Sequence, residues 1–267
     1  MILGAGFIGL RLKEALNCSL STEKIYSLHD TERLMNKFNP KIIINCIGHT
    51  GINVDDCERN LDKTLMANTF VPIILAEIAL RRRIKLIHIS SGCIYKYNYA
   101  KDKPITENKT PDFFDLFYSR SKIYTERALE VLANKFNVLI IRIRIPLDSR
   151  PHPRNILTKI IKYQQIIDLP NSVTYVPDFI KALKHLIKIN AKGIYNIVNK
   201  GSLRYHKLAA IFKKHVPSFE YKVIPFKKLN LVRTNLVLSC KKLEKTGFKM
   251  RNIEEVLEEC VKDYLKY

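Results

Sequence analysis

The chain has 267 residues, and 46% of them are hydrophobic, which suits one large α/β unit or a domain with an appended lobe. Lysine and arginine outnumber aspartate and glutamate by 46 to 25, a net charge of +21, but they are spread along the whole chain. We therefore expect a basic solvated surface and no specific nucleic-acid partner. The charge also suits anionic ligands such as dinucleotides and sugar diphosphates.

Six cysteines lie without C-x-x-C spacing, which argues against a zinc ribbon or a disulfide framework, and we expect no metal site. No apolar run approaches the roughly 20 residues that a membrane-spanning helix needs. Because Met1–Leu3 lead directly into the first glycine loop, we expect no signal peptide. We therefore expect a cytoplasmic protein with reduced cysteines and no membrane partner.

The first residues read as a strand, a glycine loop and a helix. A G-x-G-x-x-G pattern follows the apolar run Met1–Leu3, and residues 10–16 then show helical amphipathicity. Small residues let the backbone approach a pyrophosphate, which lies at the helix N-terminus. Because strands usually run about five or six residues, we expect the chain to begin a few residues late relative to a fuller parent. The expected cofactor contacts in this loop are Gly4, Gly6, Phe7, Ile8 and Gly9.

The next segment is expected to be a second strand over residues 24–28. An acidic residue near its end would hold the ribose 2′-hydroxyl, and His29 and Asp30 are the candidates at that place. Asp30 could equally cap a helix over residues 31–38. The choice between NADPH and NADH therefore stays open, with NADPH slightly preferred.

A strongly apolar strand over residues 41–48 leads into a polar loop over residues 48–56. Loops that follow the carboxyl ends of parallel strands hold ligands. A long helix is expected over residues 61–83, and composition favours a solvent-facing Asn68 within it over a functional one by roughly two to one. The cofactor contacts expected in this region are Cys46, Gly48 and Asn68.

A strand over residues 84–89 ends in Ser90 and Ser91, and a helix is expected over residues 117–136. Tyr118 and Lys122 lie one turn apart on one face of that helix. The lysine ammonium favours the phenolate, which makes the tyrosine a usable general acid or base near pH 7. Such a pair is common by chance in a Lys-rich chain, and it gains weight from the glycine loop and the serine-ended strand before it.

The alternation of strands and crossover helices predicts a Rossmann-type doubly wound parallel sheet over residues 1–145. A smaller, mixed substrate-binding lobe is expected over residues 146–267, with elements near 179–198 returning to the first domain. A proline-containing loop over residues 101–117 is expected to cover the substrate. Within the lobe we expect helices over residues 155–163, 179–189, 205–215 and 253–264, and strands over residues 165–169 and 193–198.

Several segments together resemble the extended short-chain dehydrogenase/reductase family: 91–95, 117–122, 142–146, 153–159 and 167–172. Within it, the chain looks like nucleotide-sugar reductases of the dTDP-4-dehydrorhamnose reductase type, and most like the bifunctional 3,5-epimerase/4-reductases that make UDP-rhamnose. The resemblance implies NAD(P)H-dependent reduction of a nucleotide-linked 4-keto-6-deoxyhexose. The alternative functions are those of a GDP-fucose-synthase-like enzyme and of a non-catalytic nucleotide-binding regulator on the same fold. Whether the protein forms a homodimer stays open.

The resemblance also implies residue roles. Tyr118 matches the proton donor, Lys122 the residue that binds the nicotinamide ribose, and Ser91 the residue that polarises the keto group. Cys93 and Lys159 match the pair that moves protons at sugar carbons 3 and 5. Read alone, Cys93 is a buried small residue and Lys159 a solvated charge, so these readings stay open. The substrate contacts implied by the resemblance are Ser91, Gly92, Asn155 and Arg233.

Overall fold

The computed structural model describes residues 1–51, 53–133 and 135–267, which form two compact units. The first unit comprises Met1–Ile94, Pro111–Arg142 and Leu186–Tyr195. The second unit comprises Tyr95–Thr110, Ile143–His185 and Asn196–Tyr267.

The first unit is built on a six-stranded sheet with the strand order β2-β1-β3-β4-β5-β9. Ile2 of β1 is in parallel register with Leu20 of β2 and with Ile44 of β3, so the short first strand is central. The chain moves from β1 to one side and then to the other, and such switch points are where ligands bind in α/β sheets. The strands are β1 (Ile2–Leu3), β2 (Leu20–Ser21), β3 (Ile42–Asn45), β4 (Lys85–Ser91), β5 (Val138–Ile143) and β9 (Gly193–Asn196).

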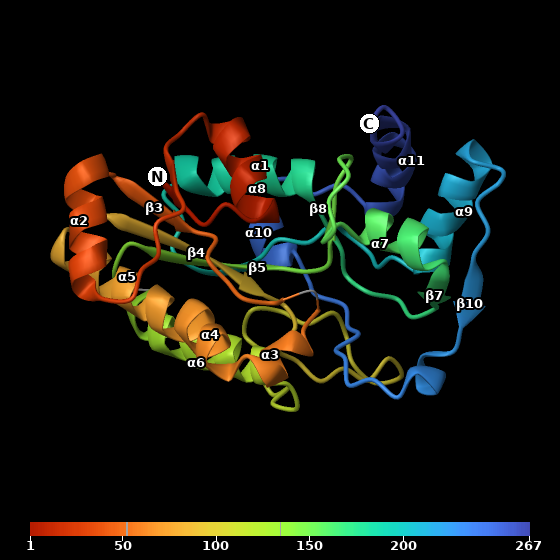
Figure 1. Ribbon diagram of the computed structural model, residues 1–267, viewed down its shortest axis with the longest axis horizontal. Coiled ribbons are helices and arrows are strands. Elements are labelled where there is room, and N and C mark those ends of the chain that lie inside the picture. Colours follow the sequence, from red (N-terminus) through yellow and green to blue (C-terminus); the bar gives the residue numbers. More distant parts are fainter. Residues whose placement is uncertain (52, 134) are drawn as a thin grey trace. The chain divides into compact units, whose positions relative to one another are not determined.

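Helices cover both faces of this sheet, with α1 on one face and α4, α5 and α6 on the other (Figure 1). Because both faces are covered, β4 and β5 are buried along their whole length. Leu75 and Ile78 of α5 join Leu86 of β4 and Ile140 of β5 in one apolar core. The helices are α1 (Phe7–Leu16), α2 (Leu28–Phe38), α3 (Asp56–Arg59), α4 (Leu61–Leu65), α5 (Val71–Arg81) and α6 (Phe117–Ala133).

The stretch Leu61–Arg81 is long and apolar enough to cross a membrane by length and composition, contrary to our expectation that no such run exists. It comprises α4, a π-helical turn η1 (Met66–Phe70) and α5. Half of its most apolar window is buried inside the fold. A helix that covers a parallel sheet must itself be apolar, and this packing accounts for its composition.

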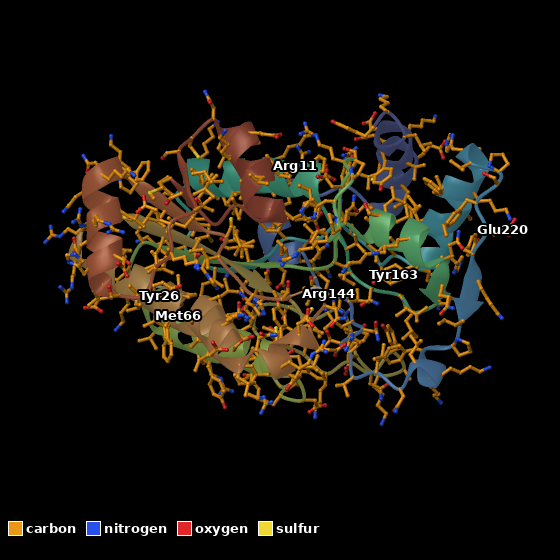
Figure 2. All side chains as sticks on the ribbon, in the orientation of Figure 1. Arg11, Tyr26, Met66, Arg144, Tyr163 and Glu220 are labelled. Carbon is orange, nitrogen blue, oxygen red and sulfur yellow. The ribbon has the colours of Figure 1, made fainter. Side chains whose placement is uncertain are left out.

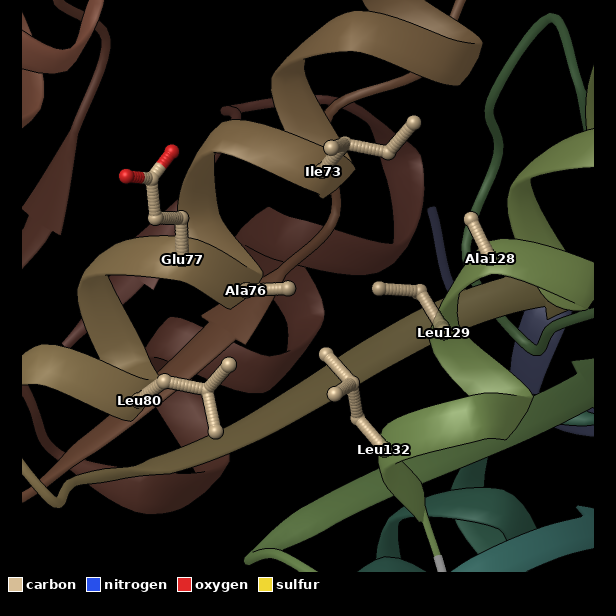
Figure 3. A pocket seen from close by; sticks show the side chains of 7 residues that line it. All are labelled: Ile73, Ala76, Glu77, Leu80, Ala128, Leu129 and Leu132. Atoms are coloured by element: carbon tan, nitrogen blue, oxygen red, sulfur yellow. The ribbon is translucent and has the colours of Figure 1, made fainter.

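An apolar groove runs between α5 and α6, and its single carboxylate, on Glu77, points away from the groove's apolar side chains (Figure 3). It offers no pair of polar groups that could act together on a substrate. The residues that line it are Ile73, Ala76, Glu77, Leu80, Ala128, Leu129 and Leu132.

The second unit holds two small parallel strand pairs, β6 with β8 and β7 with β10. Leu157, Leu208, Phe212 and Leu257 from three of its helices share one apolar core. Aromatic and charged side chains such as Tyr163 and Glu220 extend outward from its surface (Figure 2). The elements are β6 (Pro146–Leu147), α7 (Ile156–Tyr163), β7 (Gln165–Ile167), β8 (Thr174–Tyr175), α8 (Val176–Lys188), α9 (Tyr205–His215), β10 (Lys222–Ile224), the 3₁₀ turn η2 (Phe226–Leu229), α10 (Lys241–Glu244) and α11 (Ile253–Tyr264).

The second strand was expected over residues 24–28, and this prediction is wrong because β2 lies at Leu20–Ser21. Residues 24–27 instead lead into a capping box, in which the Asp30 carboxylate accepts hydrogen bonds from the backbone of Tyr26 and Ser27. The capping alternative for Asp30 is therefore confirmed. The helix expected over 117–136 begins where predicted and ends at Ala133, and residue 134 lies outside the described residues.

Two glycines of the first loop differ sharply in the space around them. A Cβ built at Gly9 would lie 1.9 Å from the Gly4 carbonyl oxygen, whereas a Cβ at Gly6 would meet nothing within 4 Å. We predict that Gly9→Ala lowers the melting temperature by several degrees, because overpacking against backbone costs about 1–3 kcal/mol. Gly6→Ala should leave the melting temperature unchanged, because Gly6 has a φ of −78° that alanine also adopts. Thermal unfolding followed by circular dichroism measures both, and equal melting temperatures would contradict the close approach.

Candidate active site

The glycine loop after β1 forms a cradle of backbone groups. Gly4 has a φ of +96°, and a Cβ there would lie 2.9 Å from the Ile47 nitrogen, so this turn requires glycine. Helix α1 begins at Phe7 without a side-chain capping bond, and its N-terminus carries the positive end of the helix dipole. Beside this N-terminus, the space at Gly6 is open. The loop fits a bound anion such as a pyrophosphate at the N-terminus of α1.

The loop after β3 flanks the same switch point. The Cys46 nitrogen donates to the Leu3 carbonyl oxygen over 2.8 Å. Burial raises the pKa of the Cys46 thiol to about 12, so it is protonated at neutral pH. A Cβ at Gly48 would lie 3.3 Å from Asn68 Oδ1 and 3.5 Å from Lys122 Nζ. Three of the expected cofactor contacts, Gly48, Asn68 and Lys122, therefore converge. The polar loop expected over residues 48–56 contains residue 52, which lies outside the described residues.

Asn68 is fully buried, so the solvent-facing reading of this residue is wrong. Its Oδ1 accepts from the His49 nitrogen over 2.8 Å, and its Nδ2 donates to the His49 carbonyl oxygen over 3.0 Å and to Ser121 Oγ over 3.2 Å. Both amide hydrogens are thus used within the protein. Asn68 lies in the π turn, and such turns occur frequently at functional sites. Its side chain joins the loop after β3 to helix α6.

Further hydrogen bonds fix the helical turn that carries Tyr118. Thr69 Oγ1 donates to the Ser121 carbonyl oxygen over 3.2 Å, and Thr125 Oγ1 donates to the Asn68 carbonyl oxygen over 2.6 Å. Ser121 Oγ donates to the Tyr118 carbonyl oxygen over 2.7 Å. The sequence alone did not predict these contacts, because a serine or threonine within a helix most often bonds to its own helix.

Tyr118 and Lys122 are both buried on α6, one turn apart. Among the described residues, the Lys122 ammonium donates no hydrogen bond, which leaves its protons for a ligand. Burial lowers the pKa of Lys122 to about 8, and the Glu126 carboxylate opposes this shift. The ammonium is therefore mostly charged at neutral pH, and a charge one turn away favours the phenolate of Tyr118.

The turn that ends β4 is held against α6. Ser91 Oγ accepts from the Cys93 nitrogen over 3.1 Å, and Ser119 Oγ donates to the Cys93 carbonyl oxygen over 2.6 Å. The hydroxyl proton of Ser91 is not used by any residue that the structure describes. Ser91 can therefore donate to a ligand oxygen. Gly92 lies between Ser91 and Cys93 in the same turn.

Three predicted site residues, Asn155, Lys159 and Arg233, belong to the second unit, and the side chain of Asn155 already makes all its hydrogen bonds within the protein. Asn155 is fully buried: its Oδ1 accepts from the Asp148 and Leu157 nitrogens, and its Nδ2 donates to the Asp148 and Arg150 carbonyl oxygens. An amide has two donor hydrogens and two acceptor sites, so none is left for a ligand. Asn155 shapes its own loop and caps α7, which argues against substrate binding by its side chain.

Lys159 and Arg233 lie in a cationic cluster with Arg154. Burial lowers the pKa of Lys159, and the charges of Arg154 and Arg233 lower it further. The loop of Arg233 is anchored by the buried Arg144 (Figure 2), whose guanidinium donates to Thr234 Oγ1 over 2.9 Å. The second unit therefore presents several positive charges close together, which suits an anion such as a diphosphate.

Two curated relatives share much of the chain. A bifunctional dTDP-4-dehydrorhamnose 3,5-epimerase/dTDP-4-dehydrorhamnose reductase from Arabidopsis thaliana is 31% identical over 82% of this chain and 75% of its own length. A trifunctional UDP-glucose 4,6-dehydratase/UDP-4-keto-6-deoxy-D-glucose 3,5-epimerase/UDP-4-keto-L-rhamnose-reductase from the same plant is 29% identical over 82% of this chain. The chain spans only 34% of the length of that second relative.

Two solved structures share the fold over nearly the whole chain. The L780 UDP-rhamnose synthase of Acanthamoeba polyphaga mimivirus has a TM-score of 0.90 and 25% identity, with 98% of both chains covered. The dTDP-4-dehydrorhamnose reductase of Bacillus anthracis, solved in complex with NADP, has a TM-score of 0.83 and 21% identity, with 97% of this chain and 96% of that chain covered. The second likeness confirms the Rossmann-type fold.

The family model described as the RmlD substrate binding domain matches residues 11–266, which includes Ser91, Tyr118 and Lys122. This match and the 31% identical plant relative agree with the resemblance noted in the sequence. The chain belongs to the RmlD substrate binding domain family.

Proposed function

We propose that the protein reduces carbon 4 of a nucleotide-linked 4-keto-6-deoxyhexose at the site formed by Ser91, Tyr118 and Lys122. The observation that carries this proposal is the position of the Lys122 ammonium beside Gly48. This ammonium donates no hydrogen bond to any residue that the structure describes. A glycine-lined cradle, a serine with an unused proton and a Tyr–Lys pair in one unit are the parts that a carbonyl reductase needs.

A bound NADPH or NADH supplies the hydride for this reduction. Lys122 binds the ribose hydroxyls through its free protons and favours the ionised form of Tyr118, which lowers the energy of giving up the phenolic proton. Tyr118 transfers that proton to the oxygen at carbon 4, and Ser91 donates a hydrogen bond to the same oxygen. Because Asp30 Oδ2 accepts the capping hydrogen bonds, we assign no acidic residue to the ribose 2′-hydroxyl and keep NADPH as the slightly preferred cofactor.

In this proposal, one part of the chain binds the dinucleotide and the other binds the nucleotide-sugar. Residues 1–145 bind the dinucleotide through the glycine loop and Gly48. Residues 146–267, without the elements near 179–198, bind the nucleotide-sugar, and the charges of Arg154 and Arg233 hold its diphosphate. We expect a cytoplasmic enzyme without a membrane or nucleic-acid partner. A homodimer stays a prediction, which analytical ultracentrifugation tests.

Epimerisation at carbons 3 and 5 is the second activity that we propose. Protons next to a ketone are acidic because the resulting enolate is delocalised, so one base and one acid are sufficient. Cys93 lies two residues after Ser91 in the turn that ends β4, and burial lowers the pKa of Lys159, which makes that lysine easier to deprotonate.

Two alternatives remain distinguishable by experiment. A GDP-fucose-synthase-like enzyme would accept a GDP-linked substrate, so a panel of UDP-, dTDP- and GDP-linked 4-keto-6-deoxyhexoses separates the two by cofactor oxidation. A non-catalytic nucleotide-binding protein would oxidise no cofactor with any of them. The buried Ser91, Tyr118 and Lys122 favour an enzyme, because a binding protein has no need of an acid–base pair.

The first functional prediction concerns Tyr118→Phe, which removes one hydroxyl. Turnover of the keto-sugar should fall by roughly 10²–10⁴-fold, as is typical when a general acid is lost, and the dinucleotide should still bind. Tyr124→Phe is the matched control, because Tyr124 is exposed on the same helix and should retain full activity. Cofactor oxidation in the steady state measures both. A Tyr118→Phe variant with wild-type turnover would show that another group donates the proton.

The second prediction concerns Gly6→Ala, whose added methyl group enters the open space of the cradle. The dissociation constant of the dinucleotide should rise by about tenfold or more, which corresponds to about 1.4 kcal/mol, at an unchanged melting temperature. Isothermal titration calorimetry measures the constant. Unaltered binding would place the pyrophosphate elsewhere.

The third prediction separates a bifunctional enzyme from a plain reductase. In deuterated water without reduced cofactor, the wild type should introduce deuterium at carbons 3 and 5 of the 4-keto substrate. Cys93→Ser should slow this exchange strongly, because serine is a far weaker base than a thiolate. It should still reduce a substrate that is already epimerised. If mass spectrometry finds no exchange by the wild type while reduction proceeds, Cys93 and Lys159 are not an epimerase pair.

A further inference from the structure

A buried ion pair includes a residue of α6 that lies one helical turn after Lys122 of the proposed active site. Glu126 of α6 is 1% exposed and Arg142 of β5 is 2% exposed. Glu126 Oε2 accepts from Arg142 Nε over 2.8 Å and from Arg142 Nη2 over 2.6 Å. The other carboxylate oxygen, Oε1, accepts a hydrogen bond from the Ser90 hydroxyl of β4. Residues of two different strands, β4 and β5, therefore hold the two carboxylate oxygens of Glu126.

Such a pair is poorly explained by stability alone. Burying a carboxylate and a guanidinium costs several kcal/mol of hydration per ion, and apolar residues of similar volume often replace a buried pair without loss of stability. A fixed buried carboxylate does, however, act strongly on any charge nearby, because the surrounding medium screens it weakly. The nearest candidate on its own helix is Lys122, one turn earlier on the same face.

The groups that face Lys122 come from four elements. Cys46 follows β3, Cys57 lies on α3, His88 lies on β4, and Tyr118 and Glu126 lie on α6. Burial raises the pKa of both thiols and lowers the pKa of His88 well below its usual value, so these three are neutral at pH 7. Burial lowers the pKa of Lys122, and among these groups the Glu126 carboxylate opposes that shift most strongly.

We propose that Glu126 is a positioning residue for the reduction: its carboxylate, fixed by Arg142 and Ser90, is the counter-charge that keeps the buried Lys122 ammonium charged. This inference rests on the proposed roles of Tyr118 and Lys122. The carboxylate acts from the side of β4 and β5, and the protons of the ammonium stay free for the ligand. Because Arg142 and Ser90 engage both oxygens of Glu126, this carboxylate does not bond to Lys122 in place of the cofactor.

The test is a direct titration of Lys122 in the folded protein. With lysine labelled with ¹³C at Cε, the Lys122 signal is the one that disappears in Lys122→Met, which also separates it from Lys85, another lysine with a pKa lowered to about 8. In Glu126→Gln the titration midpoint of Lys122 should fall by about one pH unit or more, since one unit corresponds to about 1.4 kcal/mol of interaction. Glu130→Gln makes the same change on an exposed position of the same helix and should leave the midpoint unchanged.

Activity provides the second readout. Between the two midpoints Lys122 is charged in the wild type and neutral in Glu126→Gln, so there the variant should approach the low rate of Lys122→Met. Below both midpoints its rate should return toward that of the wild type, which a lasting structural defect would not allow. If Glu126→Gln does not fold, the double variant Glu126→Gln/Arg142→Met leaves no unpaired buried charge. Its midpoint should lie below that of the wild type by a smaller amount, because loss of the Arg142 charge partly offsets loss of the carboxylate.

An unchanged Lys122 midpoint in a folded Glu126 variant overturns this inference, whatever the activity. Full activity of Tyr118→Phe or Lys122→Met would instead overturn the proposed function, and the titration would still show whether Glu126 holds the charge. The two failures are therefore distinguishable.

Discussion

The site depends on one unfavourable interaction, the burial of the Lys122 ammonium. Burial lowers its pKa from 10.5 to about 8, so the unfolded chain binds this proton more tightly than the folded protein does. The destabilisation is fully present below about pH 8, decreases as the pH rises from there, and vanishes above the unfolded value of 10.5. A residue that costs stability at neutral pH is typical of a functional site, where geometry for a ligand outweighs stability.

The rest of the first unit is arranged around that ammonium. Gly48 has no side chain, which leaves room for Lys122 Nζ and for Asn68 Oδ1. The π turn then fixes the two sides of the site to each other, because Asn68 bonds to His49 on one side and to Ser121 on the other. The short first strand is sufficient for this purpose, because backbone bonds from Met1 and Leu3 to β3 hold it in the middle of the sheet.

The sequence predicts those features that depend on neighbouring residues along the chain. The glycine loop, the Tyr–Lys pair and helices α9 and α11 follow from local patterns and lie at the predicted residues. Strand β2 was missed because two residues show no alternation, while residues 24–28 contain a buried isoleucine, Ile25, that imitates a strand. The burial of Asn68 could not be predicted, because its partner Ser121 lies 53 residues away and a π turn leaves no clear pattern in sequence. The Glu126–Arg142 pair joins a helix to a strand and is equally non-local.

The charges of the second unit constrain how one lysine could serve the proposed epimerisation. Arg154 and Arg233 lower the pKa of Lys159, which makes it a better base near neutral pH. A diphosphate bound directly to Lys159 would have the opposite effect, because two negative charges favour the ammonium. Lys159 therefore cannot be both the main diphosphate ligand and the base. If the two arginines bind the diphosphate, its negative charge cancels their effect on Lys159, and burial alone then keeps the pKa of this lysine lowered while substrate is bound.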